Sequence, residues 1–197
     1  METVTSTTLL EAIRNDEDHS AWGSFVGRYR PMIVSFAHRL GLEPSDAEDV
    51  AQETLMAFLQ RFKEGQFDRQ KGRLRTWFFS IAQSKVVDTQ RRSAREYVLQ
   101  EEETGTSQAL PGLEISGRIG AIWEEEWERT IVNASLAEVG RVLSPQTMAI
   151  FELHVVQEWP VEKVAAHLEV TPNVVYMAKM RALRKFREFR EKMEENW

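Results

Sequence analysis

Apolar residues recur at helical spacing along most of the chain, and this pattern predicts helices rather than strands. The expected helices cover residues 9–14, 21–40, 46–62, 74–92, 123–143, 145–156, 161–168 and 172–190. Pro31 lies inside the second of these helices, where we expect it to kink or break the helix locally. The predicted fold class is therefore all-α.

The expected helices fall into two groups, and the segment between them has no sustained period. Residues 96–122 are acidic and contain Gly, Ser, Thr and Pro, a composition typical of a linker. We therefore expect two small helical domains, at residues 1–95 and 123–197, joined by an acidic linker at residues 96–122.

The expected helix at residues 46–62 has an apolar face and an opposite face of acidic and amide side chains. That opposite face carries Asp49, Gln52, Glu53, Met56 and Gln60. A solvated face is the default interpretation of such a pattern. A methionine at its centre mildly favours a docking surface, because methionine side chains adapt to a partner.

A basic loop at residues 64–73 has Phe67 at its centre and leads into a basic, aromatic-rich helix. Phe67 has two possible roles: stacking on an unpaired base while nearby cations neutralise phosphates, or packing the loop onto the core. In the following helix, we expect Phe79 and Gln83 to lie away from the buried stripe. The expected contacts with single-stranded and adjacent DNA are Phe67, Arg73, Arg75, Phe79, Gln83, Lys85, Arg91 and Arg92.

Near the C-terminus, a short helix, a tight turn and a longer basic helix form a helix-turn-helix pattern. Thr171 is the expected cap of the second helix, and Pro172 its first helical residue. The alternative is a plain amphipathic helix, but the cap, the turn and the positive charge together favour DNA binding. The expected duplex contacts are Thr171, Asn173, Tyr176, Met177, Lys179, Met180, Arg181, Arg184 and Lys185.

Charge and composition support nucleic-acid binding and disfavour an enzyme. The 197 residues have a net charge of −6, but the positive charges gather in two basic segments, at residues 61–95 and 179–192. No cysteine is present, which suits a reducing cytoplasm, and no apolar run is long enough for a membrane span or a signal peptide. The four histidines show no metal-ligand spacing, and no phosphate-binding loop or nucleophile motif occurs. We expect neither a catalytic residue nor a metal or other cofactor.

These motifs, in this order, resemble a bacterial RNA polymerase sigma factor of the sigma-70 family, in its extracytoplasmic-function (ECF) group. Region 2 of that family is resembled by DAEDVAQETLMAFLQRF and LRTWFFSIAQSKVVDTQRR. Region 4 is resembled by LSPQTMAIFELHVVQEWPVEKVAAHLEVTPNVVYMAKMRALRKFRE. The resemblance implies a region 2 domain of three or four helices and a region 4 helix-turn-helix domain.

The resemblance also implies partners and roles. The face around Met56 would dock on the clamp helices of the largest polymerase subunit, with the polymerase flap as a further contact. The Phe67 loop would hold a flipped base of the −10 promoter element, and residues 171–184 would read the −35 element. Methionines stand where many members have serine or arginine, so the resemblance does not predict the promoter. The sequence leaves open whether an anti-sigma factor also binds.

Two other interpretations remain open at this point. A helix-turn-helix regulator acting without polymerase would explain the C-terminal pattern but not the acidic face around Met56. A protein-interaction module could use the same basic helices to bind an acidic partner. In the linker, the run Glu101–Glu103 is either an occupant of the polymerase channel for RNA or a solubilising spacer.

Overall fold

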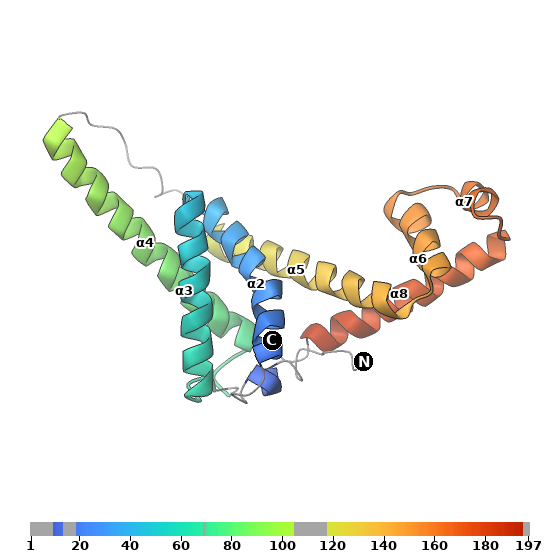
Figure 1. Ribbon diagram of the computed structural model, residues 1–197, viewed down its shortest axis with the longest axis horizontal. Coiled ribbons are helices and arrows are strands. Elements are labelled where there is room, and N and C mark those ends of the chain that lie inside the picture. Colours follow the sequence, from blue (N-terminus) through green and yellow to red (C-terminus); the bar gives the residue numbers. More distant parts are fainter. Residues whose placement is uncertain (1–9, 14–18, 69, 105–117, 195–197) are drawn as a thin grey trace. The chain divides into compact units, whose positions relative to one another are not determined.

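The computed structural model describes residues 10–13, 19–68, 70–104 and 118–194, and for residues 96–104 it describes the backbone alone. All the regular structure in these residues is helical, without a strand, which confirms the all-α prediction. The elements are α2 (His19–Arg39), α3 (Pro44–Lys63), α4 (Leu74–Thr104), α5 (Ile119–Val142), α6 (Pro145–Phe151), the π-helix η2 (Glu152–Val156), α7 (Val161–His167) and α8 (Pro172–Glu194), as labelled in Figure 1.

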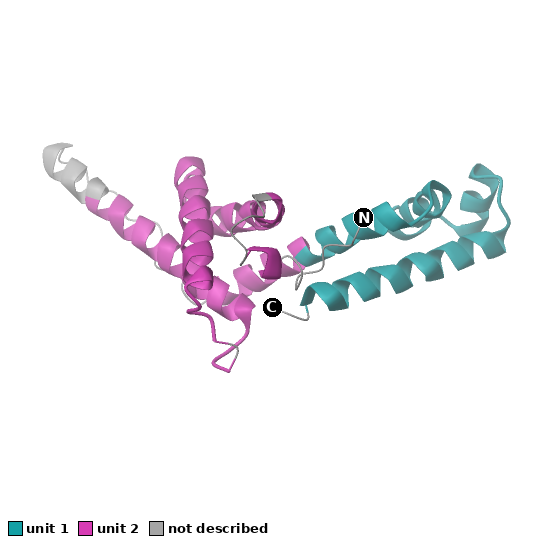
Figure 2. Ribbon diagram, turned by 60° about the horizontal axis from the view of Figure 1, so that its bottom comes forward, with its two compact units in different colours: residues 1–6, 131–195 teal, residues 7–130, 196–197 magenta. Residues whose placement is uncertain are grey.

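The chain divides into two compact units, coloured separately in Figure 2. We call the main part of unit 2 in Figure 2, Thr7–Thr130, the N-terminal unit, and the main part of unit 1, Ile131–Glu195, the C-terminal unit. The division falls inside α5, eight residues beyond the predicted boundary between residues 122 and 123. Two helices also enter the predicted linker, since α4 ends at Thr104 and α5 begins at Ile119.

An aromatic core holds the N-terminal unit together. Phe25 of α2 stacks on Phe58 of α3, with ring centroids 5.0 Å apart, and Phe58 lies 4.7 Å from Phe78 of α4. The first half of α5 adds Trp123, 5.6 Å from Phe78, and Trp127, which stacks on the ring of Tyr29 at 5.6 Å. Both tryptophans are 1% exposed, so this half of α5 is an integral part of the unit.

Helix α2 continues through Pro31 without a break. Proline lacks the N–H that would bond the carbonyl four residues earlier, at Gly27. Both Pro31 and Gly27 are exposed, so water can satisfy that carbonyl and the helix survives.

The C-terminal unit has an aliphatic core. Ile150 of α6, Val164 of α7 and Val175 of α8 lie at its centre, almost fully buried. Ser144 caps α6 as predicted, because its hydroxyl accepts a hydrogen bond from the backbone N–H of Thr147 at 3.3 Å. Helix α8 begins at Pro172, also as predicted.

Candidate nucleic-acid and protein-docking interfaces

The acidic and amide face of α3 lies in solvent. Asp49, Gln52, Glu53, Met56 and Gln60 are all exposed, and 60% of the Met56 surface is accessible. The opposite face of α3 supplies seven buried residues, including Val50 and Phe58, to the aromatic core. The predicted docking residues therefore share one accessible helical face, with an apolar side chain among the polar ones.

One predicted docking residue contacts one predicted DNA-binding residue. The ammonium group of Lys85, on α4, donates a hydrogen bond to the Glu53 carboxylate at 2.9 Å. Both side chains are partly exposed, so the pair contributes at most about 1 kcal/mol to stability. It places the Glu53 side of the docking face next to the basic helix.

The Phe67 loop lies against α4. The Phe67 ring is half-buried and 5.5 Å from the ring of Trp77, which packs in turn on Phe58 at 5.5 Å. Asp68 shapes the loop by accepting a hydrogen bond from the backbone N–H of Gln70 at 2.9 Å. The loop is thus attached to the core through Trp77, while part of the Phe67 ring stays accessible.

Two predicted DNA-binding residues of α4 instead contact α5. Phe79 is half-buried, with its ring 5.4 Å from Trp123 and 6.2 Å from Phe36, so the expectation that it lies away from the packed side of α4 was wrong. Arg75 forms an ion pair with Glu124 at 3.0 Å and lies 5.8 Å over the ring of Trp127. The first half of α5, which the sequence placed partly in the linker, covers both residues.

The other predicted contacts of this group differ in exposure. Arg73, Arg91 and Arg92 are exposed, whereas Gln83 is half-buried. Arg73 directly precedes α4, and Arg91 and Arg92 lie in its middle, where all three can contact phosphates.

A charge network that the sequence did not predict joins α2 to α5. The carboxylate of Glu126 is 1% exposed and accepts hydrogen bonds from Arg39, at 3.0 Å, and from Arg129. Arg39 also donates to Glu125 at 2.5 Å. That hydrogen bond lowers the pKa of Glu125, and the bonds to Glu125 and Glu126 raise the pKa of Arg39. In the sequence, the run of glutamates on one expected helix is the only feature that indicates such a network.

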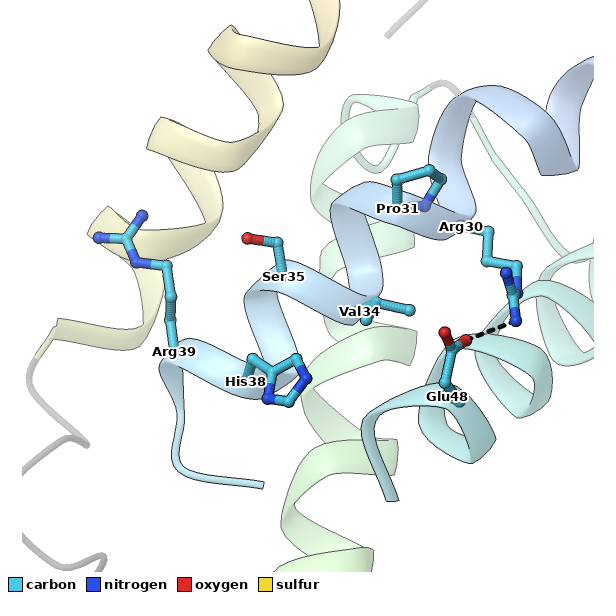
Figure 3. Close-up of a pocket in the computed structure, with 7 residues that line it drawn as sticks. All are labelled: Arg30, Pro31, Val34, Ser35, His38, Arg39 and Glu48. Atoms are coloured by element: carbon cyan, nitrogen blue, oxygen red, sulfur yellow. Dashed lines mark ion pairs between the residues drawn. The ribbon is translucent and has the colours of Figure 1, made fainter. Parts of the chain in front are cut away.

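A surface groove of about 540 Å³ lies along α2 beside this network (Figure 3). Its lining comprises Arg30, Pro31, Val34, Ser35, His38, Arg39 and Glu48. Arg30 forms an ion pair with Glu48 across the groove at 2.6 Å. Both arginines that line the groove, Arg30 and Arg39, therefore pair with carboxylates of the N-terminal unit.

The helix-turn-helix of the C-terminal unit forms as predicted. At the end of α7, Glu169 has a left-handed backbone with φ of 53°, and the N–H of Val170 bonds the carbonyl of Ala165 at 2.9 Å. After this turn, the N-terminal half of α8 has one face exposed, while Val175, Ala178 and Ala182 hold the opposite face in the core. All nine predicted duplex contacts are exposed or half-buried.

Three of the predicted cationic contacts on α8 have internal partners, and one of them is Arg184, whose guanidinium lies 3.8 Å from the Glu188 carboxylate. Lys185 donates to Glu188 at 2.6 Å, and this hydrogen bond lowers the pKa of Glu188. Arg181 donates a long hydrogen bond to Thr147 at 3.5 Å. The predicted contacts from Thr171 to Met180 lie nearer the N-terminus of α8 than these internally bonded cations.

Together these features define a class: an all-helical protein with an aromatic bundle, an exposed acidic face and a C-terminal helix-turn-helix. Within the described residues no cluster of side chains suits a metal ion, and no helix could span a membrane.

Comparisons with known proteins identify the family. The model described as "Sigma-70 region 2" matches residues 25–96, and that described as "Sigma-70, region 4" matches residues 136–186. The chain is 30% identical over 84 residues to the ECF RNA polymerase sigma factor RpoE of Cereibacter sphaeroides, a match spanning 43% of this chain and 45% of the relative. This chain therefore belongs to the sigma-70 family, in its ECF group.

A solved structure described as "Structure of CnrH in complex with the cytosolic domain of CnrY" is also similar. The similarity covers 93% of this chain and 95% of that chain, with 18% identity and a TM-score of 0.37. A likeness of this degree carries no argument about function.

Proposed function

We propose that this protein is a sigma subunit, which binds core RNA polymerase and directs promoter recognition, −10 melting and transcription initiation. The observation that carries the proposal is the exposed face of α3, where Asp49 and Glu53 flank an accessible Met56 within the region 2 match. A regulator acting alone would need the helix-turn-helix but has no use for this face. The polymerase supplies the catalysis, so the chain needs no catalytic residue and would work in the cytoplasm.

In this proposal each surface has one task. The α3 face docks on the clamp helices of the largest polymerase subunit. Phe67, whose ring is partly accessible, stacks on an unpaired −10 base, while exposed Arg73, Arg91 and Arg92 contact phosphates. The N-terminal half of α8 reads the −35 element, and the polymerase flap holds the C-terminal unit.

The test is co-purification of core polymerase with the full chain carrying Asp49→Lys. This position is better than Glu53, because replacing Glu53 also breaks the ion pair with Lys85 and confuses docking with folding. We expect stoichiometric binding by the wild type and a loss of at least tenfold in the variant. The matched control is Asp88→Lys, an exposed aspartate on α4 outside the docking face, with the same change in charge, which should bind polymerase like the wild type.

A second variant separates the two tasks of the N-terminal unit. Phe67→Ala should bind polymerase normally but open promoters poorly, since each stacked base is worth about 1–3 kcal/mol. Permanganate reactivity of unpaired thymines measures the opening. If the wild type binds duplex DNA but never polymerase, the protein is a regulator that acts alone and the proposal fails.

A further inference from the structure

The outer face of α8 exposes a group of large apolar side chains. Tyr176 is 53% exposed, Met177 55% and Met180 62%, and the three are spaced so that they share one helical face. Their helix is already anchored by its opposite side, through Val175 and Ala178. Three neighbouring apolar side chains left in solvent indicate a binding surface.

Positive charges border this apolar group. Lys179 is half-buried beside it, and Arg181 and Arg184 are exposed farther along the helix, where the Arg184 guanidinium lies 3.8 Å from the Glu188 carboxylate. Acidic residues begin only at Glu188 and Glu191, farther along the helix. A cationic border suits a polyanion, and a helix with such a border fits the major groove of duplex DNA.

The chemistry of the apolar group limits what it can read there. Methionine offers no strong hydrogen-bond donor, so Met177 and Met180 cannot form the paired bonds that select guanine. The major groove presents one apolar group, the C5 methyl of thymine. Asn173, one turn earlier and exposed, has the amide that pairs with adenine N6 and N7.

We propose that Met177 and Met180, with Tyr176 beside them, recognise thymine methyl groups in the −35 element. The base pairs under this part of α8 are therefore A·T pairs, with an adenine contacted by Asn173 next to the thymines. This inference rests on the proposed function, because it assumes that α8 enters promoter DNA. The proposed contacts with thymine methyl groups would decide which −35 sequence the protein prefers. The family resemblance does not predict that sequence.

The experiment uses the full chain bound to core RNA polymerase. A pool of promoter duplexes, randomised over ten base pairs upstream, first yields the preferred sequence. Each selected thymine is then replaced by uracil, which removes the methyl group and keeps every hydrogen-bonding group. We expect the wild type to bind about fourfold more weakly for each contacted methyl group lost.

Variants connect that loss to the side chains. Met177→Ala/Met180→Ala should bind thymine and uracil duplexes equally and remain folded, because both side chains are exposed. Lys179→Ala is the matched control on the same helix, and should weaken binding to both duplexes alike. Equal binding of thymine and uracil duplexes by the wild type would overturn the inference and leave the proposed function intact.

Two further results are informative. If the double methionine variant loses polymerase while still discriminating thymine from uracil, the face docks a protein and the inference is refuted. If the wild type binds neither polymerase nor any duplex in the pool, the proposed function itself fails.

Discussion

Replacing Trp127 with alanine should unfold the N-terminal unit selectively. The Trp127 side chain is 1% exposed, stacks on Tyr29 at 5.6 Å and on Trp123 at 6.3 Å, and carries Arg75 over its ring at 5.8 Å. Truncating a buried tryptophan costs about 3–5 kcal/mol, and that figure already includes the lost ring contacts. For a unit of this size the loss lowers the melting temperature by roughly 10–20 °C.

The assay must report each unit separately. Fluorine NMR of the full chain labelled with 5-fluorotryptophan gives one resonance per tryptophan. Trp22 and Trp77 report the N-terminal unit, and Trp159 reports the C-terminal unit. In Trp127→Ala we expect the first two resonances to show unfolding at lower temperature, while the Trp159 resonance keeps its wild-type transition.

The control and the refutation follow from the same spectra. Trp159→Ala removes a half-buried ring from the aliphatic core and should lower only the C-terminal transition, which Met193 in that unit can report after methyl labelling. If Trp127→Ala instead destabilised the C-terminal unit and spared Trp22 and Trp77, residue 127 would belong where the sequence pattern placed it. The division of the chain inside α5 would then be incorrect.

Two other predictions concern backbone strain and pH. Glu169→Gly should stabilise the C-terminal unit by about 1 kcal/mol, because glycine accepts the left-handed backbone at φ of 53° without strain. Gly41→Ala, at φ of 86° with no atom near the added Cβ, should destabilise the N-terminal unit by about the same amount. Both changes are measured as shifts in the urea midpoint of unfolding. Because the hydrogen bond from Arg39 lowers the pKa of Glu125, their interaction stabilises the folded unit at neutral pH and is lost as pH falls through that lowered pKa. Glu125→Gln should therefore be less stable than the wild type at about pH 7, and this difference should shrink as pH falls through the lowered pKa of Glu125; a difference that stays constant with pH would contradict this linkage.

The sequence predicted the helices well, because each buries one apolar stripe. The helix expected at residues 46–62 is α3, Pro44–Lys63, and the exposed face around Met56 follows directly from its periodicity. The helix-turn-helix was equally predictable, since a proline marks the start of α8. In these elements local chemistry alone decides where the helix lies.

The sequence could not predict which core each helix joins. Periodicity shows that one face of α5 is apolar, but not that Trp123 and Trp127 pack on Tyr29 and Phe78 of the N-terminal unit. Phe79 was misplaced for the same reason, because its cover comes from a helix that begins about forty residues later. Such contacts depend on tertiary packing, which single-sequence patterns do not encode.

The first half of α5 also changes the interpretation of charge in this chain. Residues 119–130 lie between the region 2 match and the region 4 match and are covered by neither model. Two of their glutamates form ion pairs within the N-terminal unit, Glu124 with Arg75 and Glu126 with Arg39. An arginine already paired in this way has fewer free N–H donors and less unbalanced charge to offer a phosphate.

This competition narrows the DNA-binding surface of the N-terminal unit. Arg75 would lose both its ion pair and its position over Trp127 on moving to DNA, whereas Arg73, Arg91 and Arg92 are exposed. Phosphate contacts should therefore concentrate on the Phe67 loop and the middle of α4, away from the part covered by α5. In the proposed function, we therefore expect the acidic half of α5 to confine promoter DNA to one side of the basic helix.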